Sequence, residues 1–375
     1  MDTDLLSRPP EEGARLIALS WLDQAAAAFP RLQDPADTEA LHDFRVGLRR
    51  LRSCLRSYRA YLEKSLPKKL RRRLRDLAAS TGPGRDTEVQ IEWLRSRSRH
   101  LGSYHRTGLA WILGRLEERM RAANEEMSAS LPKEFPRLEK DLRERLSTYH
   151  TEIRLAQPSP TLAEATANIL RLQARELESH LALVDGPEDE FEAHEARISA
   201  KRLRYLLEPF DLPEAAALVK KTKKLQEILG ELHDAHVLET ELSESLQIAA
   251  SERVRRLLEV SLSDAPDDAL IRAERRRALE SGLLALARLN RGRRNRLFGE
   301  LEADWLEGKA TEFFEEAAGV AERLGPHPPA PSPGPPSTPS PGEGETDTSK
   351  KKQGEVEVVE AVQPSEPGTR RPRFM

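Results

Sequence analysis

Residues 42–52, HDFRVGLRRLR, and residues 194–205, HEARISAKRLRY, carry the same pattern of charges. In each stretch a histidine is followed by cationic side chains three, seven and ten positions later. An α-helix turns about 100° per residue, so these four positions fall within about 80° of one helix face. The pattern therefore predicts two helices, each with a row of cations along one side. A row that occurs twice suggests two half-sites that face one extended polyanion.

The composition around these stretches favours a protein built from helices. Of the 375 residues, 33% are charged and only 5% are aromatic, which is typical of long amphipathic helices rather than of β-sandwiches. Apolar residues recur at helical spacing from about residue 11 to residue 324. Segments rich in Pro, Gly and Asp interrupt this pattern and predict helix ends, among them LPKEFP at residues 131–136. We therefore expect an all-α fold.

The internal repeat extends beyond the two basic stretches. Residues 72–86, RRLRDLAASTGPGRD, align with residues 220–234, KKTKKLQEILGELHD. Each half thus contains a helix, the histidine-bearing helix, a basic helix and further helix. This order predicts two antiparallel four-helix bundles, at residues 11–150 and 160–324, related by a pseudo-twofold axis around a basic central groove.

The alignment also pairs Gly82 with Gly230 and Asp86 with Asp234. Glycine is common where a helix ends, and aspartate is common in turns and at helix N-caps. We therefore expect both aspartates to have a turn or capping role. Thr87, three residues before a glutamine, predicts a capping box at the start of the next helix.

Cations are concentrated in one part of the chain. The formal net charge is −3, yet residues 42–75 contain 13 Lys or Arg and only two acids. An ordinary solubilising face would place acids one turn away from its cations, and such acids are scarce here. Both rows also border the apolar face of their own helix. This placement favours a partly enclosed groove, where a low dielectric strengthens the attraction for an anion.

Several features point to a cytoplasmic protein with no membrane partner. Cys54 is the single cysteine, which rules out an internal disulfide and fits a reducing compartment. No apolar run approaches the roughly 20 residues that span a bilayer. The first residues lack the apolar core of a signal peptide. Residues 325–375 are rich in Pro, Ser and Gly, which predicts a disordered tail.

Four segments together resemble the conserved histidine α-helical domain family, known as CHAD. They are HDFRVGLRRLRS, GRDTEV, HEARISAKRLRY and LQEILGELHDAHVL, and the resemblance covers roughly residues 11–310. It implies an all-helical fold of two four-helix bundles whose basic central cavity binds inorganic polyphosphate, and an association with polyphosphate granules. Some members carry a fused triphosphate-tunnel catalytic domain. This chain shows no strand pattern for one, so we expect a non-catalytic binding module.

The resemblance assigns polyphosphate binding to the two cation rows and to the basic helix that follows each row. The residues are His42, Arg45, Arg49, Arg52, Lys69, Arg72 and Arg73 in the first half and His194, Arg197, Lys201, Arg204, Lys220, Lys223 and Lys224 in the second. Each row histidine either contacts a phosphate or bonds to a neighbouring helix and orients the row. The sequence leaves both roles open.

Two other functions compete with this hypothesis. A nucleic acid or another polyanion would fit the same cations, but few aromatic residues interleave with them, which disfavours base stacking. A metal-dependent phosphohydrolase would need a ligand set. His233 and His236, with Asp234 between them, offer ligands one helical turn apart, yet zinc sites need three or four. We expect no metal, no other cofactor and no catalytic residues.

Overall fold

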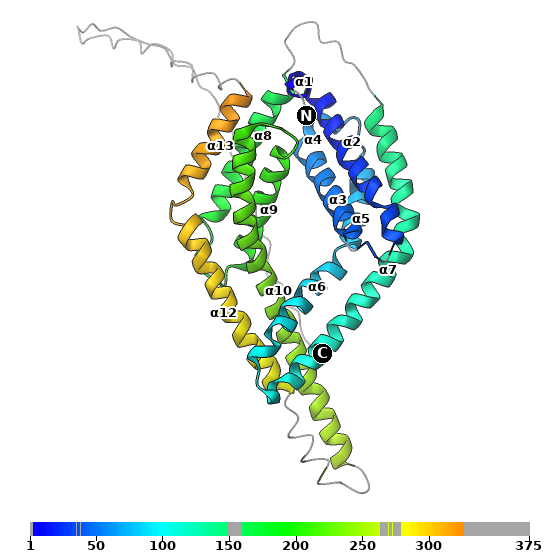
Figure 1. The fold of residues 1–375 in the computed structure, drawn as a ribbon, viewed down its shortest axis with the longest axis vertical. Coiled ribbons are helices and arrows are strands. Elements are labelled where there is room, and N and C mark those ends of the chain that lie inside the picture. Colours follow the sequence, from blue (N-terminus) through cyan, green and yellow to red (C-terminus); the bar gives the residue numbers. More distant parts are fainter. Residues whose placement is uncertain are drawn as a thin grey trace, which may run out of the picture. The chain divides into compact units, whose positions relative to one another are not determined.

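The computed structural model describes residues 3–148, 160–262 and 279–325, except Pro35 and Thr38, together with Ala269 and Arg272. All regular structure in these residues is helical, which confirms the all-α prediction (Figure 1). The expected tail lies outside the described residues apart from Gly325. The helices are α1 (Thr3–Ser7), α2 (Pro10–Ala28), α3 (Ala40–Ser57), α4 (Arg59–Leu62), α5 (Lys68–Ser80), α6 (Pro83–Arg97), α7 (Arg106–Ser147), α8 (Leu162–Leu181), α9 (Glu190–Leu207), α10 (Pro213–Ser261), α12 (Leu279–Trp305) and α13 (Thr311–Leu324), with short 3-10 turns at Pro30–Gln33, Ser98–His100 and Ser103–His105.

The two row helices bury the faces that their sequences predict. In α3 the buried side chains include Phe44, Leu48 and Leu51, which recur every three or four residues. In α9 small alanines dominate the buried face, with Leu203 completing it. Since alanine side chains are short, α9 can approach its neighbours closely.

Most helix ends follow the expected breaks, but one does not. Helix α7 runs without interruption through Pro132 and Pro136, so the helix end predicted at residues 131–136 is wrong. Proline deprives the helix of backbone hydrogen bonds. Burial of one face compensates, because Phe135 packs against Phe44 of α3 with ring centroids 4.9 Å apart.

The contacts between helices repeat in the two halves. In the first half, α2 contacts α3, α3 contacts α5, α5 contacts α7 and α7 contacts α2. In the second half, α8 contacts α9, α9 contacts α10, α10 contacts α13 and α13 contacts α8. This repeated order is the one that a duplicated bundle requires. The pseudo-twofold axis and the boundaries of the two halves stay predictions.

A second hydrophobic core mixes the halves. It contains buried side chains from α6 and α7 of the first half and from α10 and α12 of the second. Two glycines allow α7 and α12 to approach here, since a Cβ atom on Gly108 would lie 2.8 Å from Gly282 Cα. The long helices α7 and α10 thus take part in both cores, which ties the halves together.

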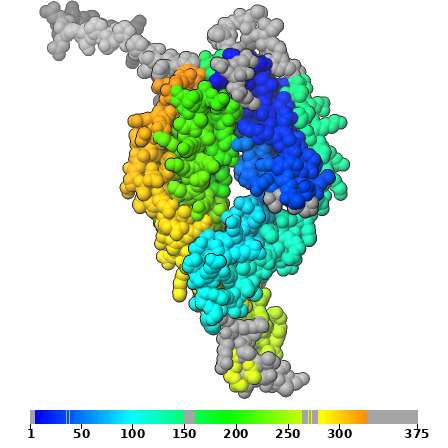
Figure 2. Space-filling model, in the orientation of Figure 1, coloured from blue at the N-terminus to red at the C-terminus, as the bar shows by residue number. Residues whose placement is uncertain are grey.

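The row helices also meet directly. Helix α3 contacts α9, and α2 contacts α8. Polar side chains join the halves beside these contacts: the Tyr58 and Thr166 hydroxyls are 2.7 Å apart, and Gln173 donates a hydrogen bond to Ser57. Figure 2 shows the surface hollowed between the green segments of the second half and the blue and cyan segments of the first.

Candidate functional site

The first cation row lies along α3 and contacts two neighbouring parts of the structure. Arg45 is half-buried and donates a hydrogen bond to the Thr81 carbonyl oxygen just after α5. Arg49 is exposed, and its guanidinium lies over the ring of Tyr205 of α9, 5.7 Å from the centroid. His42 and Arg52 are exposed at the two ends of the row.

The second row, on α9, is more enclosed than the first. His194, Arg197, Lys201 and Arg204 are all half-buried. The Arg204 guanidinium lies 4.6 Å from the Tyr205 ring centroid, so this buried ring carries one cation from each row. The second row is therefore shielded from solvent along more of its length than the first.

The electrostatics show that the two rows converge. Burial lowers the pKa of Lys201 to about 7, and repulsion from Arg197 and Arg49 adds to this shift. Burial also lowers the pKa of Arg197; Asp234 and Asp86 oppose the shift, and Arg49 adds to it. Arg49 of α3 therefore lies close enough to α9 to repel two of its cations. Such like charges, held together and partly desolvated, favour a bound anion.

The row cations are not neutralised by carboxylates. Within the described residues, Arg204 is the one row cation in an ion pair, 3.0 Å from Glu208. Glu208 is shared with Arg50, at 2.6 Å. Elsewhere cations are paired, as Arg73 is with Asp141 of α7. A solubilising face would pair its cations in this way, so the rows do not behave as one.

The histidine of the second row contacts a neighbouring helix. His194 Nδ1 lies 3.3 Å from His233 Nδ1 of α10. Burial lowers the pKa of His233 to about 4, with Arg197 as the next cause, and burial lowers the pKa of His194 as well. Both rings are therefore neutral at pH 7, and their contact supports an orienting role for His194. No group of three or more metal-ligating side chains occurs among the residues described.

The basic helix α5 turns its cations in several directions. Lys69 and Arg72 are exposed, and Arg72 lies 3.5 Å from Asp76. Arg73 points to α7 rather than to the first row. Arg75 of α5 lies near Arg52 of this row, because its charge adds to the lowering of the Arg52 pKa that partial desolvation of the guanidinium causes. Arg75 aligns with Lys223 in the repeat, which is the signal that could have identified it.

In the second half, the three candidate lysines of α10 also diverge. Gly230 of α10 lies close to the Arg197 side chain. Lys223 lies on the same side of α10 about two turns earlier, since it precedes Gly230 by seven residues. Its ammonium group is 4.0 Å from Glu227. Lys220 is exposed. Lys224 lines a separate pocket between α10, α12 and α13, away from the rows.

Asp86 and Asp234 have a different role from the one predicted. Both lie inside helices, α6 and α10, because α10 continues through Gly230. The expected turn after Gly230 is therefore wrong. The capping box at Thr87 is also wrong, since α6 begins at Pro83 and the Thr87 hydroxyl donates to the Pro83 carbonyl oxygen.

Instead, the two aspartates line one cavity of about 190 Å³ together with Arg197 of the second row. The cavity walls come from α6, α9, α10 and α12. Arg293 of α12 belongs to this wall, and the sequence offered no signal for it because it lies outside the repeated motifs. The cavity thus begins where the second cation row reaches Arg197.

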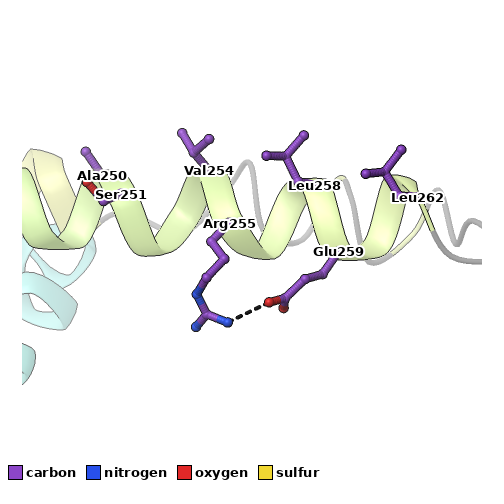
Figure 3. Close-up of a pocket in the computed structure, with 7 residues that line it drawn as sticks. All are labelled: Ala250, Ser251, Val254, Arg255, Leu258, Glu259 and Leu262. Carbon is purple, nitrogen blue, oxygen red and sulfur yellow. Dashed lines mark hydrogen bonds and ion pairs between the residues drawn. The ribbon is translucent and has the colours of Figure 1, made fainter. Parts of the chain in front are cut away.

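An apolar face at the end of α10 lies outside this region. Figure 3 shows Ala250, Val254, Leu258 and Leu262 along one side of the helix, and Arg255 paired with Glu259 on another. None of these four side chains is charged, so they offer nothing to a polyanion. Among the described residues, no helix has the length and apolar character of a membrane span.

Comparisons with known proteins identify a matching family and similar structures. A family model described as the CHAD domain matches residues 17–243. The crystal structure of the CHAD domain from the plant Ricinus communis is similar, with a TM-score of 0.53 and 23% identity over 72% of this chain and 92% of that chain. PptA from Streptomyces chartreusis aligns with a TM-score of 0.48 and 14% identity over 84% and 99% of the two chains. A search of curated proteins finds no match.

Proposed function

Because the chain belongs to the CHAD family, which is associated with polyphosphate binding, we propose that its two cation rows bind inorganic polyphosphate. The observation that carries the proposal is the convergence of cations that lack carboxylate partners. Arg49 of α3 lies beside Arg197 and Lys201 of α9, and none of the three forms an ion pair within the described part of the chain. A polyanion between the rows supplies the missing counter-charge.

Polyphosphate suits this arrangement chemically. Each internal phosphate carries about one negative charge and presents only oxygen acceptors, so recognition is electrostatic. Arginine forks and lysine ammonium groups both bind phosphate oxygens with charge-assisted hydrogen bonds. A linear chain follows a row more easily than a compact anion does, since successive phosphates meet successive cations. The hollow between the halves in Figure 2 offers a path for such a chain.

The aromatic residues near the rows favour polyphosphate over single-stranded nucleic acid. Tyr205 is only 4% exposed, and the guanidinium groups of Arg49 and Arg204 lie over its ring. Trp93 is half-buried, with Arg97 and Arg293 on its ring. Neither ring is placed as a platform on which bases stack. We expect duplex DNA at equal charge concentration not to displace long-chain polyphosphate, and displacement would contradict the proposal.

Charge reversal across both rows tests the site. The double variant Arg49→Glu/Lys201→Glu removes one cation from each row, and each charged hydrogen bond is worth about 1.5–3 kcal/mol. We expect polyphosphate affinity, measured by isothermal titration calorimetry at low salt, to fall about 100-fold or more. Arg288→Glu/Arg291→Glu, at exposed positions of α12, makes the same change in net charge and serves as the control. Wild-type affinity in the row variant, with helicity retained by circular dichroism, would refute the site.

Localisation follows from the same proposal. A protein that binds long polyphosphate chains collects where they are concentrated, so we propose that this chain associates with polyphosphate granules. A fluorescent fusion is expected to mark granules, and the row variant is expected to spread through the cell. A row variant that still marks granules would show that another surface is responsible.

A further inference from the structure

The cavity at Asp86 and Asp234 is chemically different from the cation rows. It contains two carboxylates, the guanidinium groups of Arg197 and Arg293, and the His233 ring. These groups come from four helices and from both halves of the chain. A uniform polyanion would be repelled by the carboxylates, so their place beside Arg197 of the second row needs a specific reason.

Asp86, Asp234 and Arg197 carry opposite charges but are not paired with one another in this cavity. Within the described residues, Asp86, Asp234 and Arg197 form no ion pair, although each carboxylate raises the pKa of Arg197 after burial has lowered it. Arg293 pairs with Glu231, outside the cavity lining, at 3.3 Å. The carboxylates and Arg197 therefore keep hydrogen-bonding capacity directed at the space between them.

Gln90 gives a second, independent indication of a ligand. This side chain lines the cavity and is 93% buried, since only 7% of its surface is exposed. Its amide makes no hydrogen bond to any residue that the structure describes. A polar side chain that is largely buried and has no protein partner usually marks a place where a ligand or water binds. An occupant that both donates and accepts hydrogen bonds would satisfy Gln90 and the carboxylates together.

The terminal phosphate of a polyphosphate chain has this dual character. Internal phosphates lose their single acidic proton far below pH 7. A terminal phosphate keeps a second, weakly acidic hydroxyl, whose pKa lies near 6 in comparable phosphate monoesters. Its oxygens can accept from Arg197 and Arg293 while its P–OH group donates to a carboxylate. By the volume that holds one water, about 10–15 Å³, a cavity of 190 Å³ holds a phosphate group with room for water.

We propose that this cavity is a chain-end site, in which Asp86 and Asp234 accept a hydrogen bond from the terminal phosphate of polyphosphate. The inference rests on the proposed function, because Arg197 belongs to both the row and the cavity. The proton stays in an O–H···O hydrogen bond between phosphate and carboxylate, and no covalent bond forms or breaks. Such charge-assisted hydrogen bonds are the stronger class. Internal phosphates then occupy the rows, and the chain end stops at the aspartates.

The test compares a short polyphosphate with the same chain capped at both ends by methyl esters, which remove the weakly acidic hydroxyl. Binding is measured in EDTA at pH 6 and pH 9. We expect the wild type to bind the uncapped chain about ten-fold more tightly at pH 6. This advantage is expected to be smaller at pH 9, where the terminal proton has dissociated, the aspartates repel the dianionic end, and only its extra charge still favours the uncapped chain.

Variants of the aspartates distinguish a hydrogen bond to the chain end from simple repulsion of phosphate by the carboxylates. Asp86→Asn and Asp234→Asn are expected to abolish the preference for the uncapped chain at pH 6. If the carboxylates only repel phosphate, both variants instead bind capped and uncapped chains more tightly and to the same degree. Glu244→Gln, an exposed carboxylate of α10, is the charge-matched control and is expected to keep the preference. Thermal unfolding checks that the variants fold.

Failure of this inference is separable from failure of the proposed function. Equal binding of capped and uncapped chains by the wild type overturns the chain-end site and leaves polyphosphate binding intact. A preference that appears only with Mg²⁺ and is lost in EDTA also overturns it, because the carboxylates then hold a cation rather than a proton. Binding of neither chain refutes the proposed function itself.

Discussion

Arg49 of α3 lies over the ring of Tyr205 of α9, with its guanidinium carbon 5.7 Å from the ring centroid. This contact crosses between the two halves and brings the first cation row to the second. An aromatic face attracts a cation, which offsets part of the repulsion between like charges. The rows can therefore approach each other without a carboxylate for Arg49.

Replacing this ring tests its importance for binding. In Tyr205→Leu, Arg49 and Arg204 lose a cation–π contact worth about 0.5–1 kcal/mol each, so we expect affinity for polyphosphate to fall about five- to thirty-fold. Tyr205→Phe keeps the ring and is expected to bind like the wild type. Calorimetric titration of both variants provides the measurement. Wild-type affinity in the leucine variant would mean that the ring does not position the cations.

Salt dependence tests the electrostatic character of the site. Each phosphate that the rows neutralise releases a counterion, as in nucleic-acid binding. We expect a plot of log affinity against log salt concentration to be linear and steeply negative. The slope of Arg49→Glu/Lys201→Glu is expected to be shallower, since fewer phosphates are contacted. A flat slope for the wild type would exclude binding by these rows.

Local features of the site were predictable from sequence, because helical spacing alone determines which side chains share a face. The spacing from His42 to Arg52 and from His194 to Arg204 was sufficient to predict two rows, each beside a buried apolar face. The repeat also pairs Arg75 with Lys223. Both are exposed cations on the basic helices that follow the rows.

Features that depend on tertiary packing were not predictable. Arg293 reaches the cavity because α12 packs against α10, and no sequence motif signals that contact. Gly230 predicts a turn before Asp234, yet buried leucines on both sides keep α10 helical there. Likewise, the burial of Phe135 lets α7 continue past two prolines. In each case packing outweighs the local preference.

The pH dependence of binding follows from Lys201. Its pKa of about 7, lowered mainly by burial, leaves this lysine charged at pH 6 and mostly neutral at pH 9 in the unligated protein. Phosphate favours the charged form, so binding takes up a proton above pH 7. We expect affinity to fall as pH rises, by up to about tenfold per pH unit. The arginine of Lys201→Arg stays charged, so this variant is expected to lose the part of the pH dependence that comes from Lys201. An unchanged pH profile in the variant would contradict the role of Lys201.

The same lysine has an effect of opposite direction on stability. Between about pH 7 and pH 10.4, the unfolded chain binds a proton at Lys201 that the folded, unligated protein does not. The free energy of unfolding therefore rises with pH across this window. Urea denaturation of the wild type and of Lys201→Met isolates the contribution, since the methionine does not titrate. The free energy of unfolding of the wild type is expected to increase with pH relative to that of Lys201→Met.

The crossing of α7 and α12 can be tested with two glycines of the same helix. A Cβ atom on Gly108 would lie 2.5 Å from the Leu279 carbonyl oxygen and 2.8 Å from Gly282 Cα, and these backbone atoms cannot move without separating the helices. We expect Gly108→Ala to destabilise the protein by about 1–3 kcal/mol, the usual cost of overpacking. Gly114→Ala, also in α7, meets nothing within 4 Å and is expected to stabilise by about 0.5–1 kcal/mol, because alanine is the better helix former. Urea unfolding measures both.

The crossing joins α7 of the first half to α12 of the second, so Gly108→Ala is also expected to weaken polyphosphate binding, whereas Gly114→Ala is not. Equal effects of the two substitutions would mean that this crossing does not hold the halves together.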